Sequence, residues 1–485
     1  MNTAASTEST MSVARLARLL GPWQDRPGPL YRRVTTALTE AVLDGRLAPG
    51  ERLPSHRHLA DGLGLSRSTA VRVYEEVRSA GLLESRPRSG NYVQLPEGIT
   101  RREGPWLPAT GRLSHPVDLS KAATRVDDAV LQTLSLAATD LMSFKDRDGY
   151  DVLGLLELRE AVARRFEQRG IPTTSEEILI TSGAQQGIDL VTRLLVRPGD
   201  TVALESPAYA GLIDRLRQTR ANLVSLDISE TPWDIDRFSD VVRRSQARIA
   251  FVTPDFHNPT GRLMPQHSRD VLAEVVAREK ITLVVDETNV EINLTDAPMP
   301  APLAASAPAR STITVGSLSK CVWAGLRIGW IRTNANMIQA LANLKLTSIL
   351  SVPLLEQLAS IRILADDAFD QFLASRRPRL VAQRDLVLAT ARELGMKGSE
   401  PLGGLSCWAA LPTGSSTVLA QHALQRQLLL LPGTRLSPDG VLDRFLRLPY
   451  SLPLHELQGA CAALERAWES IRGISVLNAY PDPVV

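Results

Sequence analysis

The stretch TVGSLSKCVWAGLRIGW, residues 314–330, decides how the rest of the chain is interpreted. Its Lys320 offers a primary amine, the side-chain group that forms a Schiff base with an aldehyde. Lysine is rare, with six among 55 basic residues, and the arginines that fill the other positions cannot do this chemistry. Ser317 and Ser319 precede the amine and Arg327 follows it, so hydroxyls and a guanidinium can meet one phosphate there. The spacing suits an aldehyde cofactor with a phosphate tail, although a surface turn that happens to contain a lysine fits it too.

Length and composition indicate a globular protein with more than one domain. The chain has 485 residues, 44% of them hydrophobic and 22% charged, which is too long for one ordinary domain. It has no run of about 18 apolar residues. Its N-terminus lacks the order of a signal peptide, so we expect a cytoplasmic protein that does not enter a membrane. Cys321, Cys407 and Cys461 are far apart, so neither a disulfide framework nor a metal site is expected.

The N-terminal part has the pattern of a winged helix-turn-helix. Apolar residues at helical spacing over 34–42 predict a first helix. A second helix is expected from its N-cap Ser55 through Leu63, then a turn at Gly64 and a third helix that begins near Ser66. In the third helix we expect Val71, Tyr74 and Val77 to point inward. The stretch LLESRPRSGNYVQL, residues 82–95, predicts two short strands around a basic turn, which would form the wing.

Positive charge gathers where this head would meet DNA. Residues 26–95 contain 11 Arg, no Lys and 7 acidic residues, a balance of +4. Ser66 and Arg67 open the third helix, where they can reach phosphates and base edges in the major groove. The preceding helix and the wing would contact the DNA backbone through Arg57, Arg86, Arg88 and Ser89. The other interpretation is a solvated, arginine-rich surface, but the helices, the turn and the wing agree with DNA binding.

The C-terminal part, beyond a linker rich in proline, glycine and charge, predicts an α/β fold. Five apolar segments alternate with helical patterns: residues 177–183, 201–206, 249–254, 281–287 and 311–317. Such alternation indicates a mostly parallel sheet with helices on both faces. Ligands of these sheets bind at the carboxyl ends of the strands.

Polar residues collect at those strand ends. Ser182 lies where a strand turns into a helix near Ala184, and the helix N-terminus there can hold a phosphate. Tyr209 can stack on a flat heterocycle, and Asn258 can offer its amide to a ring oxygen. Asp286 ends a very apolar strand, where a carboxylate needs a cation such as a protonated pyridine nitrogen. Each feature alone also fits a plain turn or a core side chain, but all of them occur in order at successive strand ends.

Residues 28–95 resemble the winged helix-turn-helix of the GntR family through GERLPSHRHLA, LGLSRSTA and GLLESRPRSGNYV. The resemblance implies DNA contacts at Arg57, Ser66, Arg67, Thr69 and Gly90. Many relatives have an arginine two residues after that threonine, where this chain has Val71, so the base preference of relatives does not carry over.

Residues 118–480 resemble the aspartate aminotransferase fold, fold type I of the enzymes that use pyridoxal 5'-phosphate, including a smaller C-terminal lobe with GGLSCW, LLLPGTRLSPDG and FLRLPYS. The resemblance implies that Lys320 forms the Schiff base with the cofactor and that Arg447 binds a substrate carboxylate. It further implies that the phosphate is held by Ser182, Gly183, Ala184, Ser317 and Arg327, and the ring by Tyr209, Asn258 and Asp286. One position departs from the family: where it usually has a tyrosine that binds the ring hydroxyl, this chain has Thr288 and Asn289. Efficient transamination is therefore in doubt more than cofactor binding.

The order of these parts resembles the MocR subfamily of GntR-type transcription regulators, with a DNA-binding domain over residues 26–95, a linker over 96–117 and an aminotransferase-like domain over 118–480. The resemblance implies a homodimer on double-stranded promoter DNA, with pyridoxal phosphate or an amino compound as effector. The expected targets are genes of vitamin B6 or of amino acid and amine metabolism. We expect the linker, too long to fix the head rigidly, to pass the effector's signal to the head. Two alternatives remain: an active aminotransferase with an accessory DNA-binding domain, and a purely structural body without cofactor.

Overall fold

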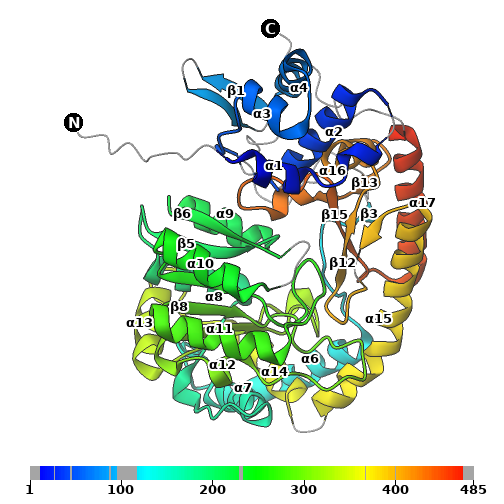
Figure 1. Ribbon diagram of the computed structural model, residues 1–485. Helices are drawn as coiled ribbons and strands as arrows, with labels where there is room; N and C mark the ends of the chain where they lie inside the picture. The colour runs from blue at the N-terminus through cyan, green and yellow to red at the C-terminus, as the bar shows by residue number, and fades with distance from the viewer. Residues whose placement is uncertain are drawn as a thin grey trace.

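The computed structural model describes residues 11–472, apart from residues 27, 44–45, 48, 87–88, 95–116, 229–232, 366–367 and 399. A small head, which ends at residue 94, lies above a large α/β body (Figure 1). Of the predicted linker, only Val117 falls within the described residues. No helix in these ranges is long and apolar enough to cross a membrane.

The head is a winged helix-turn-helix, as predicted. Ser55 and Ser66 cap its second and third main helices by accepting from the amides of His58 (3.3 Å) and Thr69 (3.1 Å), and Gly64 makes the turn between them with a φ of 67°. Two antiparallel strands form the wing. The elements are α1 (Val13–Leu20), η1 (Trp23–Asp25), α2 (Leu30–Leu43), α3 (His56–Leu63), α4 (Arg67–Ser79), β1 (Leu83–Arg86) and β2 (Gly90–Val93).

Two details of the head differ from the sequence-based expectation. Val71 was expected to point inward, but it is exposed (37%). The buried face of α4 consists of Ala70, Val73, Tyr74 and Val77, which recur at helical spacing. Val71 does not belong to this repeat and projects from the side of the helix outside that face. In addition, α1 and η1 pack into the same hydrophobic core through Leu16, Leu20 and Trp23, so the folded head includes residues before 26.

The large lobe of the body is built on a seven-stranded sheet, in the order β4-β10-β9-β8-β7-β5-β6. All pairs are parallel except those of β10, which runs antiparallel to both neighbours, so the predicted mostly parallel sheet is confirmed. The strands are β4 (Ile178–Thr181), β5 (Thr201–Ser206), β6 (Asn222–Asp227), β7 (Ile249–Val252), β8 (Thr282–Asp286), β9 (Thr312–Ser317) and β10 (Gly329–Arg332).

Helices cover both faces of this sheet, also as predicted. One face packs against α8 (Ala184–Leu195), α9 (Ala210–Gln218) and α13 (Ala335–Lys345), and the other against α10 (Ile235–Ser245), α11 (Gln266–Glu279) and α12 (Leu303–Ser306). Further elements of the body are α6 (Asp128–Asp140), η2 (Leu141–Phe144), α7 (Leu156–Gln168), η3 (Ser175–Glu177), η4 (Ala309–Ser311), η5 (Ala324–Leu326) and α14 (Leu354–Ile363).

The small lobe contains a four-stranded sheet, in the order β11-β12-β15-β14, and a parallel pair of β13 with β3. The long helix α15 runs along one side of the molecule from the large lobe toward α17 (Figure 1). The elements are β3 (Val117–Asp118), α15 (Ala368–Glu393), β11 (Lys397–Gly398), β12 (Ser406–Ala410), α16 (Ser416–Leu424), β13 (Leu428–Leu429), β14 (Leu431–Pro432), η6 (Gly433–Leu436), β15 (Phe445–Pro449) and α17 (Leu454–Ile471).

The head packs directly on the small lobe. One continuous cluster of buried apolar side chains contains the core of the head together with Leu431, Leu436, Val441 and Leu442 of the small lobe. Packing, and not only the linker, therefore determines where the head lies.

Candidate functional site

A cavity of about 400 Å³ lies where the strands of the large sheet end. The residues that line it include seven of the ten predicted for the cofactor and its substrate: Ala184, Tyr209, Asn258, Asp286, Ser317, Lys320 and Arg327. Of the other three, Ser182 and Gly183 are in contact with Arg327, and Arg447 is in contact with Asn258. The fold thus brings together residues from six separate segments of the chain.

Lys320 and Asp286 form the charged centre of the cavity. The Lys320 amine donates to the backbone oxygen of Ala122. Removal of water lowers the pKa of Lys320 to about 8, and the positive charges of Arg447 and Arg327 act in the same direction, while Asp286 opposes them. The lowered pKa makes the neutral amine, the form that attacks an aldehyde, far more abundant near neutral pH than it is in a free lysine.

The environment of Asp286 favours a cationic partner. Burial raises the pKa of this carboxyl group, while hydrogen bonds from the amide (2.9 Å) and hydroxyl of Thr288, and the charge of Lys320, lower it. A carboxylate at this depth is stabilised when a cation lies beside it, as a protonated pyridine nitrogen would. The sequence-based role of Asp286 fits this environment.

The opposite end of the cavity suits a phosphate. The Arg327 guanidinium reaches Ser319 Oγ (3.3 Å) and the backbone oxygens of Ser182 (2.7 Å) and Ala324 (3.2 Å). Ser317 Oγ donates to Ile328 O (2.9 Å) and lies 2.8 Å from Ser319 Oγ. Helix α8 begins beside them, and within the described residues no side chain caps its N-terminus. A guanidinium, two hydroxyls and free helix amides are the donors that a phosphate needs.

Gly183 keeps this end of the cavity open. A Cβ atom there would lie 2.5 Å from Arg327 Nη2 and 3.0 Å from its Cζ. We predict that Gly183→Ala displaces the guanidinium and weakens pyridoxal phosphate binding about tenfold or more, the loss of a charge-assisted hydrogen bond. Gly199→Ala is the matched control: Gly199 has nearly the same φ (+88° against +86°) but nothing within 4 Å of its Cβ position. Equal affinities of the two variants in a titration followed by absorbance would contradict the prediction.

Asn258 and Tyr209 complete the wall on the ring side. Asn258 Oδ1 accepts from Arg447 Nη1 (3.4 Å), which orients the amide. Burial raises the pKa of Tyr209 to about 12, so this ring stays neutral. In place of the family's tyrosine, Asn289 donates its amide to the backbone oxygen of Phe256 (2.8 Å), and the Thr288 hydroxyl is bonded to Asp286. Both side chains line the cavity but already have protein partners.

Arg447 is built to receive an anion. It is buried (2% exposed), its Nη2 donates to the backbone oxygen of Ser120, and among the described residues its Nε has no hydrogen-bond partner. Burial lowers its pKa to about 10, and it remains charged at neutral pH. A buried donor without a partner is costly, and a substrate carboxylate would satisfy it.

The sequence analysis missed several residues that surround the site. Lys121, Gln185 and Thr253 line the cavity. Lys121 could have been noticed because lysines are so rare in this chain; the other two carry no distinguishing pattern.

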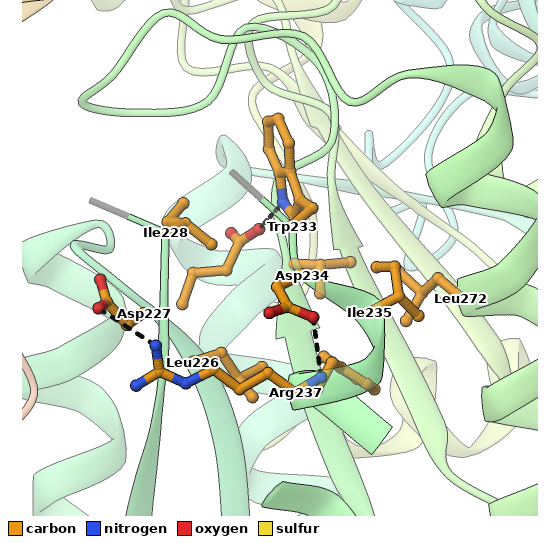
Figure 2. A pocket seen from close by; sticks show the side chains of 11 residues that line it. Leu226, Asp227, Ile228, Trp233, Asp234, Ile235, Arg237 and Leu272 are labelled. Atoms are coloured by element: carbon orange, nitrogen blue, oxygen red, sulfur yellow. Dashed lines mark hydrogen bonds and ion pairs between the residues drawn. The ribbon is translucent and has the colours of Figure 1, made fainter. Parts of the chain in front are cut away.

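A buried carboxylate behind the cavity was also missed. Glu205, at the end of β5, accepts from the Trp233 ring nitrogen (2.7 Å) and the Thr253 amide (2.8 Å), and lies 3.3 Å from His257. It borders a cavity of only about 20 Å³, room for about one water, which the ion pair Asp227–Arg237 (3.5 Å) flanks (Figure 2). This second cavity is too small for a cofactor, and Glu205 instead holds the segment before Asn258.

A further arginine fixes the backbone that carries Lys320. Arg376, on α15, donates to the backbone oxygens of Cys321 (2.8 Å) and Val322 (2.5 Å) and pairs with Asp127. Since Arg376 is buried (5% exposed), these bonds are shielded from water. The turn after Lys320 is therefore attached to the long helix.

In the head, Arg57 lies in the first turn of α3, while Ser66, Arg67 and Thr69 lie at the start of α4. Arg57 is exposed and lies 3.9 Å from Asp61. Ser66 and Arg67 are exposed, and the Ser66 hydroxyl is engaged with those of Thr69 (2.8 Å) and Ser68 (2.9 Å) as well as with the helix amide. Arg67 thus offers an extended cation from an ordered helix start, while Ser66 and Thr69 mainly stabilise that start.

The wing residues are organised around Tyr92. The Arg86 guanidinium lies over its ring, 4.2 Å from the centroid, and pairs with Glu84 (3.0 Å). Ser89 Oγ lies 2.5 Å from the Tyr92 hydroxyl. Gly90 has a φ of +120°, which favours glycine, so its part is to shape the turn. Arg88 lies outside the described residues.

Comparison with known proteins supports both parts of this description. Residues 115–464 match the family model "Aminotransferase class I and II", and residues 30–93 match "Bacterial regulatory proteins, gntR family". Among curated relatives, a 2-aminoadipate transaminase of Thermus thermophilus is 29% identical over 65% of this chain and 81% of its own length. The transcriptional regulator TauR of Rhodobacter capsulatus is 27% identical over 87% of this chain and 93% of its own.

A third curated relative is a regulator, and a similar solved structure is an aminotransferase. The probable rhizopine catabolism regulatory protein MocR of Rhizobium meliloti is 29% identical over 64% of this chain and 66% of its own. The α-aminoadipate aminotransferase LysN of Thermus thermophilus, solved with N-(5'-phosphopyridoxyl)-L-leucine, has a TM-score of 0.69 and 26% identity over 78% of this chain and 98% of its own.

Proposed function

Because this chain belongs to the aminotransferase class I and II family and carries a GntR-type domain at its N-terminus, as MocR-like regulators do, we propose that it is a transcription regulator whose body senses pyridoxal 5'-phosphate or an amino compound. Pyridoxal 5'-phosphate is the cofactor of the body, and the GntR-type head binds DNA. The observation that carries the proposal is that one chain contains both a cavity lined by seven of the predicted cofactor and substrate residues and a helix-turn-helix whose third helix starts with exposed residues.

The residues of the cavity divide the work of holding the cofactor. When bound, pyridoxal phosphate supplies an aldehyde and an electron-withdrawing ring. Lys320 would provide the amine for the aldehyde, and Asp286 would stabilise a proton on the ring nitrogen. Arg327, Ser317 and the start of α8 bind the phosphate. Arg447 takes the carboxylate of an amino compound, which therefore belongs to the amino acids or related acids.

The runner-up function is an active aminotransferase with an accessory DNA-binding domain. Lys320 and Arg447, which a transaminase needs, favour it. Against it stand Thr288 and Asn289, whose polar groups are already bonded to Asp286 and to the backbone of Phe256. Without the family's tyrosine, fewer donors remain for the ring oxygen of pyridoxal phosphate. Fewer bonds that stabilise the transition state predict slower transamination.

A second copy of the chain is the expected protein partner. Five large apolar side chains are exposed in neighbouring segments of the large lobe: Leu131 (48%), Leu136 (54%), Met142 (73%), Tyr150 (67%) and Leu156 (47%). A contiguous exposed apolar patch marks an interaction surface, and we propose that these side chains form one in the dimer. A homodimer would bring two heads to paired sites on double-stranded promoter DNA, and the protein would act in the cytoplasm, where that DNA is.

A DNA-binding titration tests the proposed function. The full-length protein would be titrated onto its own promoter region with and without pyridoxal phosphate, and with a set of amino compounds. A regulator should change its affinity by about 5- to 150-fold, the usual range of allosteric coupling. Constant affinity under all conditions, together with multiple turnovers between an amino acid and a 2-oxo acid, would instead favour the aminotransferase. The target genes we propose are those of vitamin B6 or of amino acid and amine metabolism.

A further inference from the structure

Residues 431–445, the bridging segment, contact the head through a buried interface. The Asp443 amide donates to the backbone oxygen of Leu43 (2.9 Å) at the end of α2. Arg444 pairs with Glu40 (3.3 Å), and both side chains are only 19% exposed. Glu40 also pairs with Arg26 (2.6 Å). Ion pairs at this depth are far less screened than surface pairs, so they fix the orientation of α2 on the body.

The bridging segment also contacts the large lobe beside the cavity. The Ala208 amide donates to the backbone oxygen of Leu436 (2.8 Å), and Arg435 pairs with Asp214 of α9 (3.3 Å). Ala210 belongs to the same hydrophobic cluster as the head. Tyr209, which lines the cavity, therefore lies between two residues that contact the bridging segment or its cluster.

A third connection leads from the bridging segment into the cavity along β15. Phe445 stacks on Trp408 of β12, with ring centroids 5.3 Å apart and planes 1° apart. Trp408 is the register partner of Arg447, two residues beyond Phe445 on the same strand. Because side chains two apart on a strand lie on the same face, a movement of Arg447 toward a carboxylate would be passed through the packed Trp408 and Phe445 to the neighbouring Arg444.

We propose that the bridging segment, and not the linker, couples the cofactor cavity to the DNA-binding head. The occupancy of the cavity changes the positions of Tyr209 and Arg447, and these side chains bias the contact of residues 431–445 with α2. This inference rests on the proposed function, since it names the route by which an effector would alter DNA binding. A coupling requires an element with two arrangements that both sites favour differently, and the interface between head and small lobe is that element.

The test compares two ways of disturbing the connection in the full-length protein. The double variant Glu40→Gln/Arg444→Gln removes the half-buried ion pair between α2 and the bridging segment, while a second variant lengthens the linker by a glycine-serine insertion within residues 96–116. For each, DNA affinity is measured with and without pyridoxal phosphate, and the absorbance of bound cofactor reports that the cavity is intact. Asp240→Asn, which removes an exposed ion pair with Arg243 on α10, is the matched control.

We expect the affinity ratio to fall close to one in the double variant and to remain at the native value, about 5- to 150-fold, in the linker variant and the control. The opposite pattern, loss on lengthening the linker and retention in the double variant, would overturn the inference. Amide exchange of the native protein gives an independent readout: pyridoxal phosphate should change the exchange of Asp443 and of α2. If DNA affinity responds but this exchange does not, the inference fails and the proposed function stands. If neither responds, both fail.

Discussion

Lys320→Ala is expected to abolish the visible absorbance band of protein-bound pyridoxal phosphate. The variant keeps Arg327, the serines and the start of α8, so it still binds the phosphate, but the covalent bond requires the amine. The cofactor should then be lost on dialysis, whereas the native protein retains it. Lys397→Ala, at an exposed lysine of β11, provides the control and should retain the band.

The outcome also identifies the reacting amine among those near the cofactor. Lys121 is the other lysine that lines the cavity, and it pairs with Asp118 (2.9 Å). Lys121 is held by this carboxylate, whereas burial lowers the pKa of Lys320 to about 8 and makes its neutral, reactive form more accessible. A band that survives in Lys320→Ala and disappears in Lys121→Ala would show that the assignment is wrong.

Arg67→Ala is expected to weaken DNA binding by about 1 to 3 kcal/mol and to lower the salt dependence by about one phosphate contact. The reason is geometric: Ser66 caps α4 and points the first helical residue outward, so Arg67 extends from an ordered helix start. Val71 lies one turn further on the same exposed face, where an apolar side chain can contact a thymine methyl group.

The matched control for Arg67 is Arg244→Ala, which removes the same charge from an exposed position (83%) on α10 of the body. Titrations of promoter DNA at several salt concentrations would compare the affinity and the salt dependence of the Arg67→Ala and Arg244→Ala variants. Equal losses in both variants would mean that only the overall charge matters, and the placement of DNA on α4 would be contradicted.

Seven of the ten residues chosen from the sequence line one cavity, because the choice used rare groups at strand ends. Lys320 is distinctive because lysine is rare in this chain, and Asp286 because a carboxylate after an apolar strand is costly to bury without a partner. For this reason Lys320 and Asp286 could be identified from their neighbours alone. Residues such as Gln185 and Thr253 could not, because they reach the cavity only through the path of the folded backbone.

The error at Val71 and the contact between head and small lobe have different causes. At Val71 the apolar side chain suggested burial, but the helical repeat had already assigned the inward positions to Ala70, Val73, Tyr74 and Val77. The contact joins segments about 400 residues apart, Leu43 with Asp443, and is made partly by backbone atoms. No local pattern of residues encodes such a contact, so the linker alone was considered.

Arg376 has a consequence for how the protein can move. Its guanidinium ties α15 to the peptide groups just after Lys320, and α15 continues for 17 more residues toward the small lobe. The backbone beside Lys320 is thus not free to shift independently of that helix. A tilt of α15 would therefore also move the backbone beside Lys320. A rotation of the small lobe and a change in the shape of the cavity would then occur together.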